Sequence, residues 1–245
     1  MKRYRDVAII AAILIVISAG LYIFHYFTFH DPHHIFIFML GDLAFLPLEV
    51  LIVGIVVERI LSRREMEERL QKLNMVVGAF FSEIGHRLMT TLMEATAQKD
   101  DVIAHIDVTP NWTDADYKKA RNFIESIDPL RFESIDLEQL KTYLVGKRPF
   151  MLALIENPNL LEHERFTDLL LAVFHLTEEL ESRPQVVNLP ERDIAHIYGD
   201  INRIYKSSIT QWLEYMAHLK SNYPFLYSHY LRIHPFQLHP SAIIE

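Results

Sequence analysis

Long apolar runs fill most of the N-terminal part of the chain, at residues 7–27 and 35–57. An α-helix needs about 20 apolar residues to cross the hydrocarbon core of a bilayer, and each run reaches that length. Because only a short segment separates the runs, we expect a transmembrane helical hairpin, domain 1–57, with the lipid bilayer as a partner. A cleaved signal peptide is the alternative for the first run, but its apolar stretch exceeds a signal core and a second run follows at once.

Positively charged residues flank the two runs on one side only. Lys2, Arg3 and Arg5 precede the first run, several Arg residues follow the second, and the connecting segment 28–34 has neither Lys nor Arg. Segments rich in Lys and Arg stay on the cytoplasmic side of a membrane. The pattern therefore predicts a multi-pass protein of the cell inner membrane with both termini in the cytoplasm.

Apolar positions beyond the second run recur with helical spacing. Gly54 is the only potential helix breaker between Pro47 and Gly78, so we expect the second span to continue into a juxtamembrane helical stalk at residues 58–78. One apolar stripe follows this region and consists of Met66, Leu70, Leu73, Val77 and Phe80. The stripe is compatible both with packing on the protein's own domain and with a parallel coiled coil.

The segment 79–236 is predicted to be an all-α cytoplasmic helical bundle, followed by a C-terminal tail at 237–245. Thr113 and Asp116 have the spacing of a capping box, and the helix that they open should end at Asp128 and Pro129. Apolar periodicity and helix breakers predict further helices at residues 137–145, 149–155, 162–182 and 225–233. Gly146 marks the end of the first of these.

Two further patterns predict how the bundle is arranged. The run 169–174 is apolar on every side, so its helix is expected to lie at the centre. The longest helix should extend from Pro190 to the break at Pro224. Its buried stripe is predicted to contain Ile194, Tyr198, Ile201, Tyr205, Ser208, Trp212, Met216 and Leu219.

Composition excludes several function classes. Asp and Glu outnumber Lys and Arg, 32 to 24, which gives a net charge of −8 and argues against nucleic acid as a partner. The chain has no cysteine, so disulfides, thiolate metal sites and cysteine nucleophiles are excluded. It also lacks a glycine-rich phosphate loop, a nucleophile elbow and an H-E-x-x-H motif. We therefore predict no cofactor and no catalytic residue.

Asp42 and Glu49 form an intramembrane polar seam in the second span. The two residues are seven positions apart, so they lie on the same face of the helix. A carboxylate within a bilayer is costly, so it faces protein or water, pairs with a partner, or carries a proton. The seam therefore predicts a self-association surface or a site of proton or cation transport. Protonated carboxyl groups that hydrogen-bond to the first span, or to backbone freed by Pro47, are the simpler alternative.

Histidines gather in and beside the connecting segment. His25, His30, His33 and His34 surround Asp31 at the predicted outer surface of the membrane. Imidazoles beside a carboxylate can bind a transition metal or sense pH. An ordinary interfacial turn is the simpler interpretation.

Metal-binding spacings also occur in the predicted bundle. Glu83 precedes His86, and Asp193 precedes His196, with the i,i+3 spacing that di-iron bundles use. A helical wheel, however, places Asp193, His196, Asp200, Glu214 and His218 on a polar flank that we expect to be solvated. His175 follows the apolar run and is expected to be a buried histidine satisfied by Glu178 or Glu179. Glu83, His86 and His175 are therefore kept only as an unfavoured metal-site hypothesis.

Two segments carry a resemblance to a known family. They are the stretch from Gly41-Asp42-Leu43 through Leu46-Pro47-Leu48-Glu49 into Leu73–Gly85, and the stretch from His218 to Phe236. The chain resembles an uncharacterised family of prokaryotic two-span membrane proteins with a helical cytoplasmic domain. The resemblance implies a topology and brings no established activity. Glu83 belongs to the family pattern, whereas His86 stands where a small polar residue is usual, which weakens the metal hypothesis.

The sequence thus favours a membrane-anchored scaffold or signal-relay module that acts through protein contacts. Its expected partners are a second copy of the chain and a cytoplasmic protein. A small transport or channel subunit that uses Asp42 and Glu49 is the first alternative. A membrane-anchored metalloenzyme or hydrolase is the second.

Overall fold

The computed structural model describes residues 2–127, 129–158, 160, 163–237, 240, 241 and 243, without the side chains of residues 2–8 and 67–70. All regular elements in these ranges are helices, and one isolated β-bridge joins Thr96 to Phe132. The predicted all-α fold is therefore confirmed for this part of the chain. Asp128, Glu162 and the side chain of Leu70, on which parts of the predictions depended, lie outside it. The chain divides into two compact units, Met1–Met66 and Glu67–Glu245, which are described separately.

The first unit contains helix α1, Lys2–Phe29, and the beginning of helix α2, Pro32–Phe80. The reversal between the helices is short because His30 adopts a left-handed conformation with φ of 50°. Asp31 then caps α2, since its Oδ1 accepts hydrogen bonds from the backbone N–H groups of His33 and His34 at 2.9 and 3.3 Å. The side chains from Ile9 to Met66 are exposed, apart from half-buried His25, His34 and Ile35.

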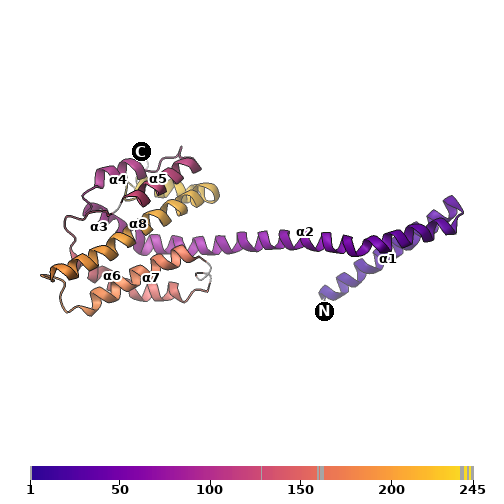
Figure 1. Cartoon of the computed structure of the whole chain (residues 1–245), viewed down its shortest axis with the longest axis horizontal. Coiled ribbons are helices and arrows are strands. Elements are labelled where there is room, and N and C mark those ends of the chain that lie inside the picture. The colour runs from indigo at the N-terminus through magenta and orange to yellow at the C-terminus, as the bar shows by residue number, and fades with distance from the viewer. Residues whose placement is uncertain are drawn as a thin grey trace. The chain divides into compact units, whose positions relative to one another are not determined.

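Helix α8, Glu191–Asn222, lies at the centre of the second unit (Figure 1). It packs against α3 (His86–Glu94), α5 (Asp114–Ser126), α7 (Glu164–Ser182) and α9 (Pro224–Ile233). The predicted stripe is buried from Ile201 to Leu219, whereas Ile194 and Tyr198 are half-buried. The prediction that α7 is central is wrong. Leu171 is exposed and Phe174 half-buried, because α7 packs against α6 and α8 on one face only.

Helix α6, Leu137–Ile155, corrects a second prediction. Gly146 and Pro149 lie inside this one helix instead of separating two. A glycine in a helix costs only about 1 kcal/mol, and a proline removes one backbone hydrogen bond. Leu140 and Leu144 before the breakers, and Met151 and Leu154 after them, form one buried face, and α6 packs along α7. Burial of that face offsets the local cost.

The capping box is confirmed at the start of α5. The backbone N–H and the hydroxyl of Thr113 donate to Asp116 Oδ2 at 2.8 and 2.7 Å. The predicted helix at residues 225–233 is confirmed as α9, one residue longer at its start. Helices α3, His86–Glu94, and α4, Lys99–Ile106, were not predicted.

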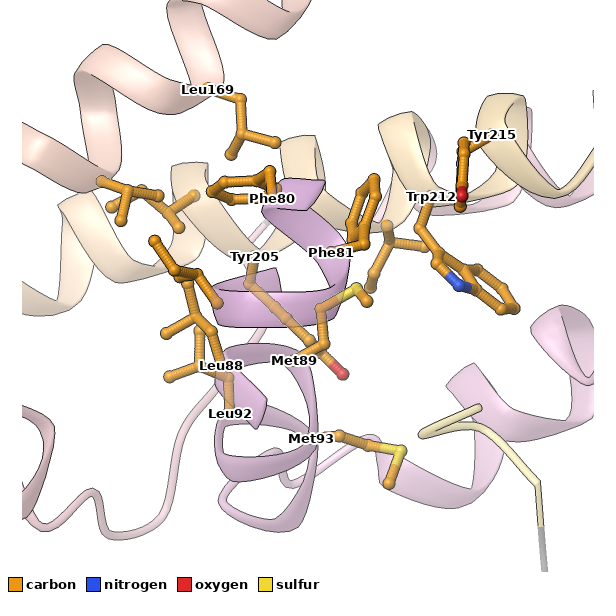
Figure 2. Close-up of a cluster of buried hydrophobic side chains, with 14 of the residues drawn as sticks. Phe80, Phe81, Leu88, Met89, Leu92, Met93, Leu169, Tyr205, Trp212 and Tyr215 are labelled. Carbon is orange, nitrogen blue, oxygen red and sulfur yellow. The ribbon is translucent and has the colours of Figure 1, made fainter. Parts of the chain in front are cut away.

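The last part of α2 enters the core of the second unit. Leu73, Val77 and Phe80 are buried, so this part of the apolar stripe packs on the protein's own domain, whereas Met66 is exposed. A π-helical turn, η1 (Phe81–Gly85), follows and leads into α3. Figure 2 shows Phe80 directed toward Leu169, and Phe81 directed toward Trp212 and Tyr215. Phe80 and Phe81 are adjacent in the sequence, yet they pack in different parts of the core, one beside Leu169 of α7 and the other beside Trp212 and Tyr215 of α8.

A glycine and a hydroxyl donor from another helix accompany the π-helical turn. A Cβ at Gly85 would stand 2.4 Å from Cδ1 of Phe81, so only glycine fits beside that ring. A π-helix also disturbs the regular pairing of backbone carbonyls. The hydroxyl of Tyr143, from α6, lies 3.0 and 3.1 Å from the carbonyl oxygens of Glu83 and Ile84 and donates to them. Burial raises the pKa of Tyr143 to about 12, so the hydroxyl keeps its proton.

Candidate functional site

The residues of the metal hypothesis, Glu83, His86 and His175, lie in separate places. Glu83 Oε2 is 2.8 Å from Nζ of Lys147 in an exposed ion pair. His86 lines a cavity beside α3, and His175 lies on the surface of α7. Within the described ranges, no three His, Asp or Glu side chains are placed so that they could hold a metal ion. The structure thus gives these residues different surroundings instead of one centre.

His175 and Asp200 both differ from their predicted environments. The side chain of His175 is 51% exposed, because Val173, Leu176 and Thr177 occupy the buried face of α7. The prediction of a buried histidine is therefore wrong. Asp200 was expected in solvent, yet its side chain is only 11% exposed, since α7 packs along that flank of α8.

The buried carboxylate of Asp200 organises a polar cluster between α7 and α8. Its Oδ1 accepts a hydrogen bond from Nη2 of Arg203 at 2.7 Å. Nε2 of His175 and Nε2 of His196 stand 3.9 and 3.8 Å from Oδ2. His196 is exposed, as expected. The cluster therefore places one guanidinium and two imidazoles around one carboxylate.

Arg183 binds the neighbouring acids. Its guanidinium lies 2.6 Å from Oε2 of Glu179 and 2.6 Å from Oδ1 of Asp193. Hydrogen bonds from this guanidinium lower the pKa of both carboxyl groups. Asp193 therefore belongs to an ion-pair network with Arg183 and Glu179.

A cavity of about 450 Å³ opens between α3, α4 and the segment after α9. Its polar walls include His86, Thr90 and His234, and its charged rim includes Glu94, Lys99 and Asp100. His234 is 1% exposed, and burial, followed by the nearby His86, lowers its pKa to about 4. Burial also lowers the pKa of His86. Near neutral pH the cavity therefore presents uncharged imidazoles, which donate and accept hydrogen bonds without adding positive charge.

Few polar groups compensate the burial of His234. Among the described residues, no group forms a hydrogen bond of regular geometry with either ring nitrogen, and Oδ1 of Asp107 stands 3.6 Å from Nε2. The rings of Trp212 and Phe236 pack around the imidazole, with centroids 5.3 and 6.4 Å away. Sequence analysis missed His234 because it follows the last helix, where no periodic pattern predicts burial.

A second cavity, of about 300 Å³ and with mostly apolar walls, lies between the end of α2, the end of α8 and the start of α9. It is called the α2/α8/α9 cavity below and is lined by Asn74, Met75, Gly78, Tyr215, His218, Leu219, Tyr223 and Leu226. Gly78 permits a close approach of helices here, because a Cβ would stand 2.6 Å from the Tyr215 hydroxyl.

His218 is one of the polar residues of the α2/α8/α9 cavity. Its Nδ1 lies 3.1 Å from the amide nitrogen of Asn74 and 3.2 Å from that of Asn222. Because both amides can donate, Nδ1 acts as the acceptor and the proton resides on Nε2. Burial lowers the pKa of His218, so the ring is uncharged near neutral pH.

Of the predicted polar residues of the first unit, Asp42 and Glu49 lie on exposed helix surface, whereas His25 and His34 are half-buried. Asp42 and Glu49 both project from α2 on either side of Pro47. Nδ1 of His34 stands 3.4 Å from Nε2 of His25. Asp31 uses its carboxylate as the cap of α2. The roles suggested for the seam and for the histidines remain predictions.

Comparison with known proteins places this arrangement in a family. Residues 69–232 match the model described as "Uncharacterized protein MJ1433, C-terminal helical domain", and residues 2–61 match "MJ1433, N-terminal helical domain". The chain belongs to the MJ1433 family. It is similar to "Uncharacterized protein MJ1433" of Methanocaldococcus jannaschii, with 44% identity over 100% of this chain and 98% of the relative. No solved structure matches the chain.

The family descriptions agree with the helical division of the structure. One helical domain covers the segment with the apolar runs, and the other covers most of the second unit. The family supplies neither an activity nor a membrane location. Both must therefore be argued from the residues themselves.

Proposed function

We propose that this MJ1433-family protein is an integral membrane protein whose N-terminal helices cross the bilayer. The supporting observation is the exposed surface of the first unit. Two helical segments are long and apolar enough to span, Ile9–Phe29 and a stretch of α2 that starts at Pro32, and no side chain in their most apolar windows is buried. Ile15, Val16 and Phe24 are among the most exposed of these apolar side chains. An apolar surface of this extent needs a cover, and lipid is the simplest one.

The role that we propose is that of a membrane-anchored scaffold or relay acting through protein contacts. Helix α2 supports it, because the same helix carries the exposed apolar segment and the core residues Leu73, Val77 and Phe80. The polar seam of Asp42 and Glu49 would then be covered by a second copy, since a bilayer penalises uncovered carboxylates. The alternative is proton or cation transport through the seam, and a flux measurement distinguishes it from self-association.

Cysteine labelling of the full-length protein in cells tests the proposed anchor and topology. The chain has no natural cysteine, so His33→Cys and Ser241→Cys each introduce a single reactive site. We expect a membrane-impermeant maleimide to label His33→Cys in intact cells. Ser241→Cys should react only after permeabilisation, because the cationic flanks hold both termini inside.

The matched pair makes the result interpretable. Both sites are exposed on the protein, so a difference between them reports the compartment and not burial. Labelling of Ser241→Cys in intact cells would reverse the proposed orientation. Release of the protein from membranes by alkaline carbonate would contradict the proposal that the N-terminal helices span the bilayer.

A further inference from the structure

The surface around the α2/α8/α9 cavity combines a hollow with exposed apolar side chains. Phe225, at the start of α9, is 71% exposed, and Met75, at the lip of the cavity, is 65% exposed. The ring of Phe225 lies 6.4 Å from that of Tyr223, which lines the cavity. An exposed aromatic side chain beside an apolar cavity is the arrangement found at the anchor residues of protein interfaces.

The lining of the cavity suits an apolar and uncharged insert. Leu219, Leu226 and Tyr223 form apolar walls, and the eight lining residues include no Asp, Glu, Lys or Arg. His218 is uncharged near neutral pH because burial lowers its pKa, and burial raises the pKa of Tyr215, whose hydroxyl keeps its proton. The cavity, of about 300 Å³, is large enough for one aromatic side chain.

We propose that this face binds a second copy of the chain, with Phe225 of each copy inserted into the α2/α8/α9 cavity of the other. The side chain that fits the cavity stands next to that cavity on the same surface. Two copies related by a twofold axis can therefore fill both cavities at once, each with the Phe225 side chain of the other copy. This is the geometry of an isologous dimer. The uncharged lining permits this contact, because identical charged faces would repel each other. The contact lies within the second unit, which begins at Glu67 and includes the end of α2, and does not depend on where the first unit resides.

Cross-linking in native membranes tests the contact. In the full-length, cysteine-free chain, Met75→Cys places one thiol at the lip of the cavity and leaves Phe225 in place. A short bismaleimide should then join two copies. Adding Phe225→Asp should reduce the cross-linked dimer at least about tenfold, because a charged side chain would enter an apolar cavity. Adding Leu171→Asp, on the exposed face of α7, should leave the yield unchanged.

Each other outcome overturns the proposal. A dimer that persists in the Phe225→Asp background would place the contact elsewhere, and a product that joins Met75→Cys to a different protein would assign the cavity to another partner. Unchanged thermal unfolding of the Phe225→Asp variant, followed by the fluorescence of Trp112 and Trp212, excludes misfolding as the cause of a loss. Because the readout is the cross-link at Met75, failure here leaves the labelling test of the membrane anchor unaffected.

Discussion

Both units of this protein are rich in apolar residues, but they use them in opposite ways. Apolar side chains of the first unit surround their helices on all sides and are exposed in the isolated chain. Those of the second unit lie on one face of each helix and bury one another around α8. The difference shows that periodicity, more than content, separates a segment that needs an outside cover from one that forms a core.

Paired truncations of one aromatic side chain from each unit should give the largest contrast. Trp212 is buried in α8, and Trp212→Ala should lower the free energy of unfolding by about 3–5 kcal/mol because it leaves a cavity. Phe24→Ala in α1 should leave the stability of the helical unit unchanged. Urea unfolding of the full-length protein in detergent, followed by far-UV circular dichroism, measures both. Equal losses would mean that the two units do not differ as described.

Acid should destabilise the second unit through His234. The folded state holds the pKa of this imidazole at about 4, against an ordinary value of 6.5. Below pH 6.5 the unfolded chain takes up a proton that the folded protein resists. The contribution of His234 to stability should therefore fall as the pH drops from 6.5 toward 4, by about 3 kcal/mol in total, and this contribution should change no further below that.

Substitution of His234 tests this pH dependence directly. His234→Phe keeps an aromatic ring beside Trp212 and Phe236 and should flatten the loss of stability between pH 6.5 and 4. His229→Gln, at an exposed position of α9, serves as the matched control and should keep the wild-type slope. An unchanged slope in His234→Phe would assign the acid sensitivity to other groups.

Two glycines inside helical segments should respond in opposite directions to alanine. Gly85→Ala forces the ring of Phe81 to move and should cost about 1–3 kcal/mol as an overpacked core. In the described part of the chain, no neighbouring group lies within 4 Å of the position that a Cβ would take at Gly146, so Gly146→Ala should stabilise the protein by up to about 1 kcal/mol. The urea midpoints of the two variants, compared with that of the wild type, measure both changes. A stable Gly85→Ala protein would show that the π-helical turn can relax.

The smallest expected change concerns the polar seam of the first unit. Combining Asp42→Asn with Glu49→Gln keeps hydrogen bonding and should preserve the oligomeric state in mild detergent. The matched Asp42→Leu and Glu49→Leu double variant should shift the protein toward monomer. Light scattering on detergent-solubilised protein measures the mass. A proton or cation flux in liposomes that disappears with Glu49→Gln, while the oligomer persists, would favour the transport alternative.

Local signals explain which parts of the fold could be predicted. The capping box of Thr113 and Asp116 and the stripe from Ile201 to Leu219 are encoded within a few turns of one helix. The break predicted at Gly146 failed because its local cost is smaller than the gain from burying the continuous face of α6. The sequence shows the local cost of Gly146 in a helix directly. The free energy gained by burying the face of α6 depends on its packing against α7, which the sequence pattern does not show.

The candidate sites were harder to predict because their residues come from distant segments. The cavity of His86 and His234 lies between α3 and the segment after α9. The periodicity of either segment does not indicate that the other packs against it. His175 was predicted to be buried and is exposed, whereas Asp200 was predicted to be exposed and is buried, for a similar reason. A helical wheel identifies the flank of a helix, but the neighbour packed on that flank decides whether the flank is buried.

The sequence by itself determined the all-α character, the apolar segments and the stripe of the central helix, because each depends on spacing along one segment. Only the tertiary structure decided the burial of Asp200 and His234, the continuity of α6 and the hollow beside Phe225. Burial is a property of contacts between segments, and the free energy of those contacts exceeds the local preferences that a sequence displays.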